Sequence, residues 1–216
     1  MTDDRISGLA LIAGSTGVIV ALSLHPSGRD LFVPSQFEAE ARKLVAVHSV
    51  ALACLPVWFF GAYGLSRRLA PSGRLAVAAL VTYGFALAAM MNALVFDGLV
   101  TPGLAREIVS ATGTAAQAWR VAFNHNGLID QAFMRVFLVA SSVAIILWSA
   151  TIVRSRAIAR GAGIYGCVLG VATVVAQLSG QLESHAHLFG MVIVGQAIWF
   201  VVAGTWLCRA SNANEV

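Results

Sequence analysis

Charged residues are scarce in this sequence. Only 11% of its 216 residues are Asp, Glu, Lys or Arg, whereas 58% are hydrophobic. A soluble domain is usually about 25% charged and about 45–50% apolar, so this composition excludes an ordinary soluble globule. The formal net charge is +4, but the basic residues lie mainly in short turns between apolar runs, where they act as topology signals. We therefore expect no nucleic-acid partner.

Cysteine is also rare. Cys54, Cys167 and Cys208 share no short spacing and lie within or at the edge of apolar stretches. We interpret them as small hydrophobic residues rather than as a redox pair or a thiolate metal site. The first eight residues place two acids before the only arginine and are followed by no small-residue cleavage signal, so we expect the first apolar run to remain as a membrane helix.

Long apolar runs are abundant, and each membrane-spanning helix needs ~20 mostly apolar residues. We predict an all-α integral membrane bundle that forms one polytopic domain over residues 1–216. Its six transmembrane helices are predicted at about 8–24, 44–65, 75–100, 131–153, 161–181 and 187–208.

The connections between these helices differ in length. Residues 26–43 and 101–130 are predicted as longer loops, the second with an interfacial helix near 115–123 that Gly113 and Gly127 would end. Gly166 and Gly170 form a GxxxG pair, which indicates close helix packing within the bundle.

Arginine is concentrated in the two short turns, residues 66–74 and 154–160. By the positive-inside rule these turns and both termini are predicted to be cytoplasmic, and the two longer connections extracytoplasmic. Lys43 is the only lysine beside 13 arginines. This bias hints at GC-rich bacterial coding and hence at a multi-pass protein of the bacterial inner (plasma) membrane.

All five histidines fall at the predicted outer side. His25 ends the first span, His48 lies one turn into the second, and His125 precedes the fourth, while His185 and His187 open the sixth. One helical turn rises ~5.4 Å. On that scale a set of polar residues reaches a similar depth and is predicted to line one cup: His48, Asp97, Arg135, Gln177 and His187.

Imidazole suits zinc, copper, iron and haem iron, so this clustering predicts a transition-metal or haem site. The predicted metal ligands are His25, His48, His125 and His187, with His185 as an alternative to His187. Asp97 or Gln177 would orient an imidazole, Gln177 being the predicted cofactor-binding residue. The expected function is an oxidoreductase that exchanges electrons with a lipid-soluble carrier. No HExxH motif or dense histidine box accompanies the cluster.

Other interpretations remain open. A metal-free intramembrane isomerase, cyclase or transferase would act on a lipid or isoprenoid, with Asp97 or Glu183 as acid, His48 as base and Arg135 holding an anionic head group. Asp97 and Arg135 could instead form a structural ion pair. A small transporter or channel subunit is a third function, although the inner halves of the predicted helices offer few polar groups for a path. A purely structural or assembly role is the fourth.

Overall fold

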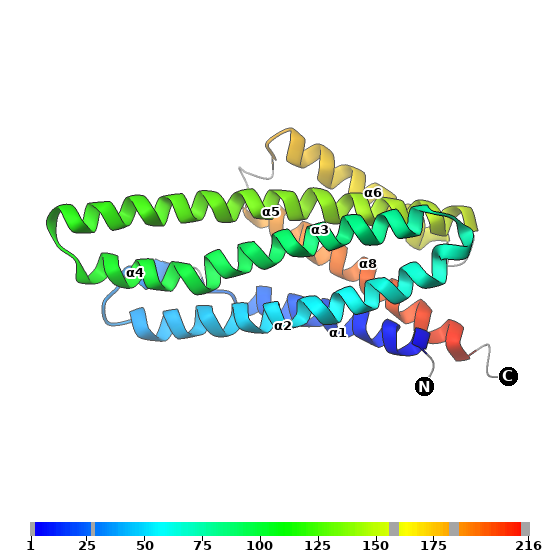
Figure 1. The fold of residues 1–216 in the computed structure, drawn as a ribbon, viewed down its shortest axis with the longest axis horizontal. Helices are drawn as coiled ribbons and strands as arrows, with labels where there is room; N and C mark the ends of the chain where they lie inside the picture. Colours follow the sequence, from blue (N-terminus) through cyan, green and yellow to red (C-terminus); the bar gives the residue numbers. More distant parts are fainter. Residues whose placement is uncertain (1–2, 27–28, 156–159, 182–185, 213–216) are drawn as a thin grey trace.

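The computed structural model describes residues 3–26, 29–155, 160–181 and 186–212, and this part of the chain contains helices and no strand. Figure 1 shows an elongated bundle whose longest helices lie side by side. The helices are α1 (Asp3–Leu24), α2 (Phe37–Leu69), α3 (Leu75–Val95), α4 (Thr101–Ser110), α5 (Gly113–Ser155), α6 (Arg160–Leu178) and α8 (Ala186–Asn212). Shorter segments are η1 (Arg29–Phe32), η2 (Ala70–Ser72) and η3 (Phe96–Val100).

Within the described residues, six helical stretches are long and apolar enough to cross a membrane, which confirms the predicted all-α membrane bundle. α1 packs against α2 and α8, while α5 packs against α3 and α6. The chain enters and leaves the bundle at the same end (Figure 1). Ion pairs at that end join Asp3 and Asp4 to Arg67, with N···O distances of 2.8 and 3.1 Å.

The two longer connections are more helical than predicted, the first from Phe37 onward and the second over most of its length. α2 already begins at Phe37, and α5 runs without a break from Gly113 to Ser155, so neither a separate interfacial helix nor an end at Gly127 is present. At 1.5 Å per residue the 43-residue α5 is ~65 Å long, about twice the ~30 Å hydrocarbon core of a bilayer. The fall in hydropathy near residue 131 marks an end of the apolar stretch, not of the helix.

The projecting helical parts form a headpiece, which we define as η1, α4, residues 37–47 of α2 and residues 113–129 of α5 (Figure 1). It has a hydrophobic cluster of its own, separate from the main core. The buried members of this cluster are Leu31, Phe37, Ala41, Leu44 and Ala105, and Phe123 packs against them.

α2 carries a regular apolar stripe whose spacing alternates between three and four residues. Its buried positions include Leu44, His48, Ala51 and Leu55. Residues at this spacing share one face of a helix, so His48 occupies a core position in an otherwise apolar row.

The continuity between α3 and α4 depends on the π-helical segment η3. Pro102 has no amide hydrogen to donate to the Gly98 carbonyl, and its ring would crowd that carbonyl in a regular α-helix. The wider turn accommodates it, and the Phe96 carbonyl instead accepts hydrogen bonds from the Thr101 amide, the Thr101 hydroxyl at 3.1 Å and the Asn126 amide at 3.2 Å. π-turns of this kind are frequent at functional sites.

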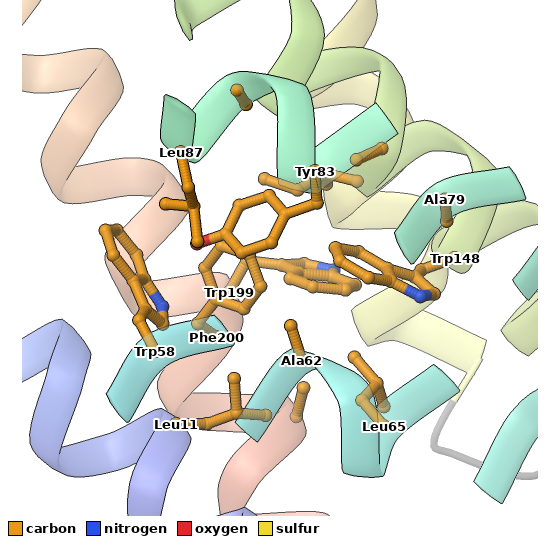
Figure 2. Packing of buried hydrophobic residues seen from close by; sticks show 14 of the residues in the cluster. Leu11, Trp58, Ala62, Leu65, Ala79, Tyr83, Leu87, Trp148, Trp199 and Phe200 are labelled. Atoms are coloured by element: carbon orange, nitrogen blue, oxygen red, sulfur yellow. The ribbon is translucent and has the colours of Figure 1, made fainter. Parts of the chain in front are cut away.

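The part of the core nearer the termini is filled by aromatic side chains, seen together in Figure 2. Each is at most 1% exposed, and their ring centroids lie 5.1–6.0 Å apart in edge-to-face or stacked pairs. We call Trp58, Tyr83, Trp148, Trp199 and Phe200 the aromatic cluster.

Two tryptophan nitrogens of this cluster have hydrogen-bond partners. Trp148 Nε1 donates to Ser66 Oγ at 2.8 Å, and Trp199 Nε1 donates to the Ala162 carbonyl at 3.2 Å. The cluster therefore ties α2, α5, α6 and α8 together while it fills the space between them.

Candidate metal centre

Two histidines and one aspartate converge at the junction of α1, α2 and η3. The Nε2 atoms of His25 and His48 each lie 3.1 Å from the same oxygen, Asp97 Oδ2. The three available ligand atoms all lie within 4.8 Å of one another. With metal–ligand bonds of about 2.1 Å, neighbouring ligands lie about 3.0 Å apart at right angles and about 3.4 Å apart in a tetrahedron. The two Nε2–Oδ2 distances of 3.1 Å are close to both values.

The local sequence explains why His25 can reach this point. A residue before proline is pushed out of the helical region, and proline cannot continue the hydrogen-bond ladder. Pro26 therefore ends α1 at Leu24, so that His25 leaves the helix beside the bundle instead of continuing along its axis. Its side chain is 37% exposed.

His48 is held more tightly, because its side chain is only 4% exposed. Gly98, the residue after Asp97, makes this approach possible. A Cβ atom at Gly98 would collide with Cβ and Cγ of His48, which are rigid parts of that side chain. Only glycine allows η3 to lie this close to α2, and the close approach brings Asp97 onto the imidazole.

Both imidazoles are oriented through their other ring nitrogen. Nδ1 of His25 donates to the Pro26 carbonyl and Nδ1 of His48 to the Leu44 carbonyl, each at 2.8 Å. A carbonyl oxygen only accepts, so Nδ1 carries the hydrogen in both rings and Nε2 of each neutral ring presents a lone pair. Metal-ligating histidines show this pattern, in which a carbonyl fixes the ring and its tautomer.

The contacts of Asp97 with two imidazole nitrogens require positive charge or protons between these groups. Neutral Nε2 lone pairs would repel the Asp97 carboxylate at 3.1 Å. The hydrogen bond and charge of Asp97 favour the protonated form of His25 and raise its pKa above the ordinary value, against the opposing effect of burial. One proton satisfies one of the two contacts, and a second proton is needed for the other. A single divalent cation would carry the same charge and could contact all three groups at once.

The three residues face a cavity of about 530 Å³, within the range of about 300–1,000 Å³ that is typical of small-molecule sites. All six membrane-spanning stretches, or the residues next to them, contribute to its wall. Its polar lining consists of His25, His48, Asp97, Asp130, Gln131, Arg135 and Gln177.

The predicted ligands do not all meet here. The structure brings His25 and His48 together with Asp97, whose carboxylate could serve as a third ligand atom. His125 does not line this cavity: its side chain is exposed on α5 and bonds to the Val121 carbonyl at 2.9 Å. His187 lies in α8, but its side chain is outside the described part of the chain, as are Glu183 and His185 altogether.

Arg135 and Gln177, two further residues of the predicted cup, line the same cavity as Asp97 and His48. Sequence reasoning missed Asp130 and Gln131, which also line it. A signal was present, since Asp130 lies about one turn before Arg135 at the edge of an apolar stretch. It also missed Asn126, whose amide donates to Thr101 Oγ1 at 3.0 Å and to the Phe96 carbonyl and so supports η3.

The chain matches no protein-family model, no curated protein and no solved structure. The evidence for its chemistry is therefore the geometry of His25, His48 and Asp97 and of the cavity that they face.

Proposed function

We propose that this chain is a membrane metalloprotein that binds one divalent first-row transition-metal ion through His25, His48 and Asp97. The observation that carries the proposal is the convergence of two carbonyl-oriented Nε2 atoms on one carboxylate oxygen. Two imidazoles and one carboxylate are the ligand set of non-haem iron(II) oxygenases and of catalytic zinc sites such as those of the His₂Glu type.

Three protein ligands leave coordination positions for a substrate or for water. In this chain such positions would face the cavity, because His25, His48 and Asp97 all line it. The geometry supports a bare ion better than haem: a porphyrin leaves only two opposite axial positions, whereas three ligand atoms converge here.

The proposed site is catalytic and is reached from one side of the membrane only. The aromatic cluster fills the core between the cavity and the end of the bundle that holds the termini. A transport path needs polar groups or water along its length. A closed aromatic core supports a site that holds and transforms a molecule over one that passes it across the membrane.

The site is proposed to face the extracytoplasmic side of a bacterial inner membrane. Arg67, Arg68 and Arg74 lie at or near the turn between α2 and α3, at the end opposite the headpiece. The positive-inside rule assigns that end to the cytoplasm. A fluorescent reporter that matures only in the cytoplasm should therefore fluoresce when fused to the C-terminus; a dark but intact fusion would reverse the orientation.

A metal titration tests the proposed function directly. Detergent-purified protein, stripped of metal, should bind one equivalent of Co²⁺ and develop d–d absorption bands. Asp97→Asn keeps the shape of the side chain but removes the charged ligand, and His48→Ala removes an imidazole. Both should weaken Co²⁺ binding at least tenfold, whereas His125→Ala, which changes a histidine outside the cluster, should bind like the wild type.

Elemental analysis of the protein as isolated, after expression with iron and zinc supplied, should find one of these metals in stoichiometric amount. Equal Co²⁺ binding by the wild type and both ligand variants would refute the proposed centre. Absence of Co²⁺ binding by correctly folded wild type would refute it as well.

The competing function is a metal-free acid–base enzyme. The observation that favours it is that Asp130 and Arg135 line the same cavity as Asp97 and His48, which offers two carboxyl groups and a base in one site. Without a metal, the two contacts between Asp97 and the imidazoles of His25 and His48 require two protons. We therefore rank the metal-free enzyme second. It becomes the first if folded wild-type protein binds no metal.

A further inference from the structure

The wall of the cavity changes from polar to apolar along α2 and α3. On α2, His48 is followed toward the aromatic cluster by Ala51 and Leu55. On the adjoining helix, Asp97 in η3 is preceded by Leu94 and by Met90, which lies seven residues away on the same side. At 1.5 Å per residue, the apolar lining extends ~10 Å beyond the metal ligands on both helices.

The same order holds on the other two helices that line the cavity over several turns. His25 follows Leu22, Ala21 and Val18, the three lining residues of α1, all of which are apolar and lie deeper. On α5, the lining begins with Asp130 and Gln131, continues through Met134 and Arg135, and ends at the apolar Leu138, eight residues or ~12 Å beyond Asp130. The cavity therefore has a polar end at the metal centre and an apolar end close to the aromatic cluster.

This gradient runs parallel to the axes of membrane-spanning helices. The polar end lies at the boundary of the apolar stretches, close to the level of lipid head groups, and the apolar end points toward the middle of the bilayer. A lipid in that leaflet has the same orientation, with its head group outside and its chain inside. Such a molecule could enter without turning over.

We propose that the cavity binds a single-chain amphiphile of the adjacent membrane leaflet, with an oxygen-bearing head group at the ion and its apolar chain toward the aromatic cluster. The inference rests on the proposed metal centre and adds the class of molecule on which it acts. At water's share of about 30 Å³ per non-hydrogen atom, the 530 Å³ volume holds roughly 18 such atoms. A fatty acid, a fatty alcohol or a short prenyl alcohol fits this size.

The polar end of the cavity would recognise the head group of this ligand, and the apolar end its chain. An alcohol or carboxylate oxygen is a suitable donor for the open positions of a first-row ion. The apolar walls from α1, α2, α3 and α5 bury the chain, and each buried methylene group contributes about 0.8 kcal/mol relative to water. We therefore expect affinity to increase with chain length until the cavity is full.

A binding experiment with defined probes tests the chain site. Protein in phosphatidylcholine nanodiscs is incubated with saturated 1-alkanoic acids of 8 to 16 carbons and analysed by native mass spectrometry. Wild type should retain one molecule of decanoic acid. Leu55→Trp, which fills the apolar end far from the ligands, should weaken this binding at least tenfold, and Val57→Trp, on an exposed position of the same helix, should not.

A second variant keeps the test decisive if Leu55→Trp does not fold. Leu138→Ala removes volume from the wall and should shift the preferred chain length upward, while Val136→Ala, at an exposed position nearby, should leave it unchanged. Equal binding of all chain lengths by wild type and both cavity variants would overturn the inference.

The head-group contact is tested separately with Co²⁺-loaded protein. Decanoic acid labelled with ¹³C at its carboxyl group should show strong paramagnetic broadening, and the same acid labelled at its methyl group should not. Cavity-dependent binding of the acid without any Co²⁺ binding would refute the proposed function but support the chain site. Normal Co²⁺ binding without binding of any alkanoic acid would refute this inference and leave the metal centre intact.

Discussion

The Nε2 atom of His48 lies 3.1 Å from Oδ2 of Asp97, across the interface between a regular helix and a π-turn. The two residues are far apart in sequence and have no local reason to meet. Their contact depends on the missing side chain of Gly98 and on the widened turn before Pro102. The backbone, rather than a flexible side chain, therefore sets the geometry of the candidate centre.

Substitution of Gly98 tests this dependence. In Gly98→Ala the new Cβ would collide with the Cβ of His48, so α2 and η3 must separate by on the order of an ångström and His48 must draw away from Asp97. We expect Co²⁺ affinity to fall at least tenfold, as measured by titration. Gly84→Ala is the matched control, because its Cβ would meet only Phe59, at an ordinary contact distance of 3.7 Å. Unchanged affinity in Gly98→Ala would contradict the stated role of the close approach.

The stability of the metal-free protein should depend on the protonation of His25. The hydrogen bond with Asp97 raises the pKa of His25 in the folded state, so the stabilisation by its protonated form is complete below the unfolded value of about 6.5. It is lost as the pH rises through the raised folded-state value. The thermal melting temperature of the metal-free protein should therefore fall over this window.

His25→Gln should flatten that decrease, whereas His125→Gln should retain it. With Co²⁺ in excess the dependence should reverse, because the ion displaces the imidazole proton and binds more tightly at higher pH. A melting temperature that rises with pH in the metal-free wild type would be incompatible with the His25–Asp97 pairing.

The glycine pair of α6 makes a prediction about assembly. Cβ atoms at Gly166 and Gly170 would clash with α5, in the second case with Ile146 at 2.5 Å and with the Ser142 carbonyl at 2.8 Å. The pair thus lies within the fold rather than on a free surface. Gly170→Leu should lower the melting temperature without changing the molecular mass measured by light scattering in detergent. Gly161→Leu is the control, since no described atom lies within 4 Å of its Cβ position; a change in mass for Gly170→Leu alone would favour an interface between copies.

The helical class and the number of spanning helices could be predicted from the sequence, because burial in lipid requires long apolar runs. The helix ends at the headpiece could not. Hydropathy falls where α5 leaves the apolar layer, yet the amide hydrogen bonds continue without a break to Gly113. In water a helix needs only one apolar face, and the headpiece supplies one through Phe37, Leu44 and Ala105.

The sequence predicts how deep the site residues lie in the membrane, but not the direction in which each faces around its helix axis. Spacing along the chain placed His48 and Asp97 at one level, and the structure brings them together. His125 was predicted as a ligand of the same site, yet adjacent helical positions differ by about 100°. Asn126 faces inward to the Phe96 carbonyl, so His125 is turned toward the outside. The rotation of a helix about its axis depends on its packing partners, and these are set by the whole fold.

The position of the aromatic cluster also determines how the site would respond to an energised membrane. Moving one elementary charge across a full bilayer at 100 mV changes its free energy by about 2.3 kcal/mol. The candidate ligands lie at the edge of the apolar layer, and the apolar end of the cavity and then the aromatic cluster occupy the depth behind them. Most of the electrical potential therefore falls across Trp58, Trp148 and their neighbours rather than between the ion and the adjacent water. Occupancy of the centre should be nearly independent of membrane voltage.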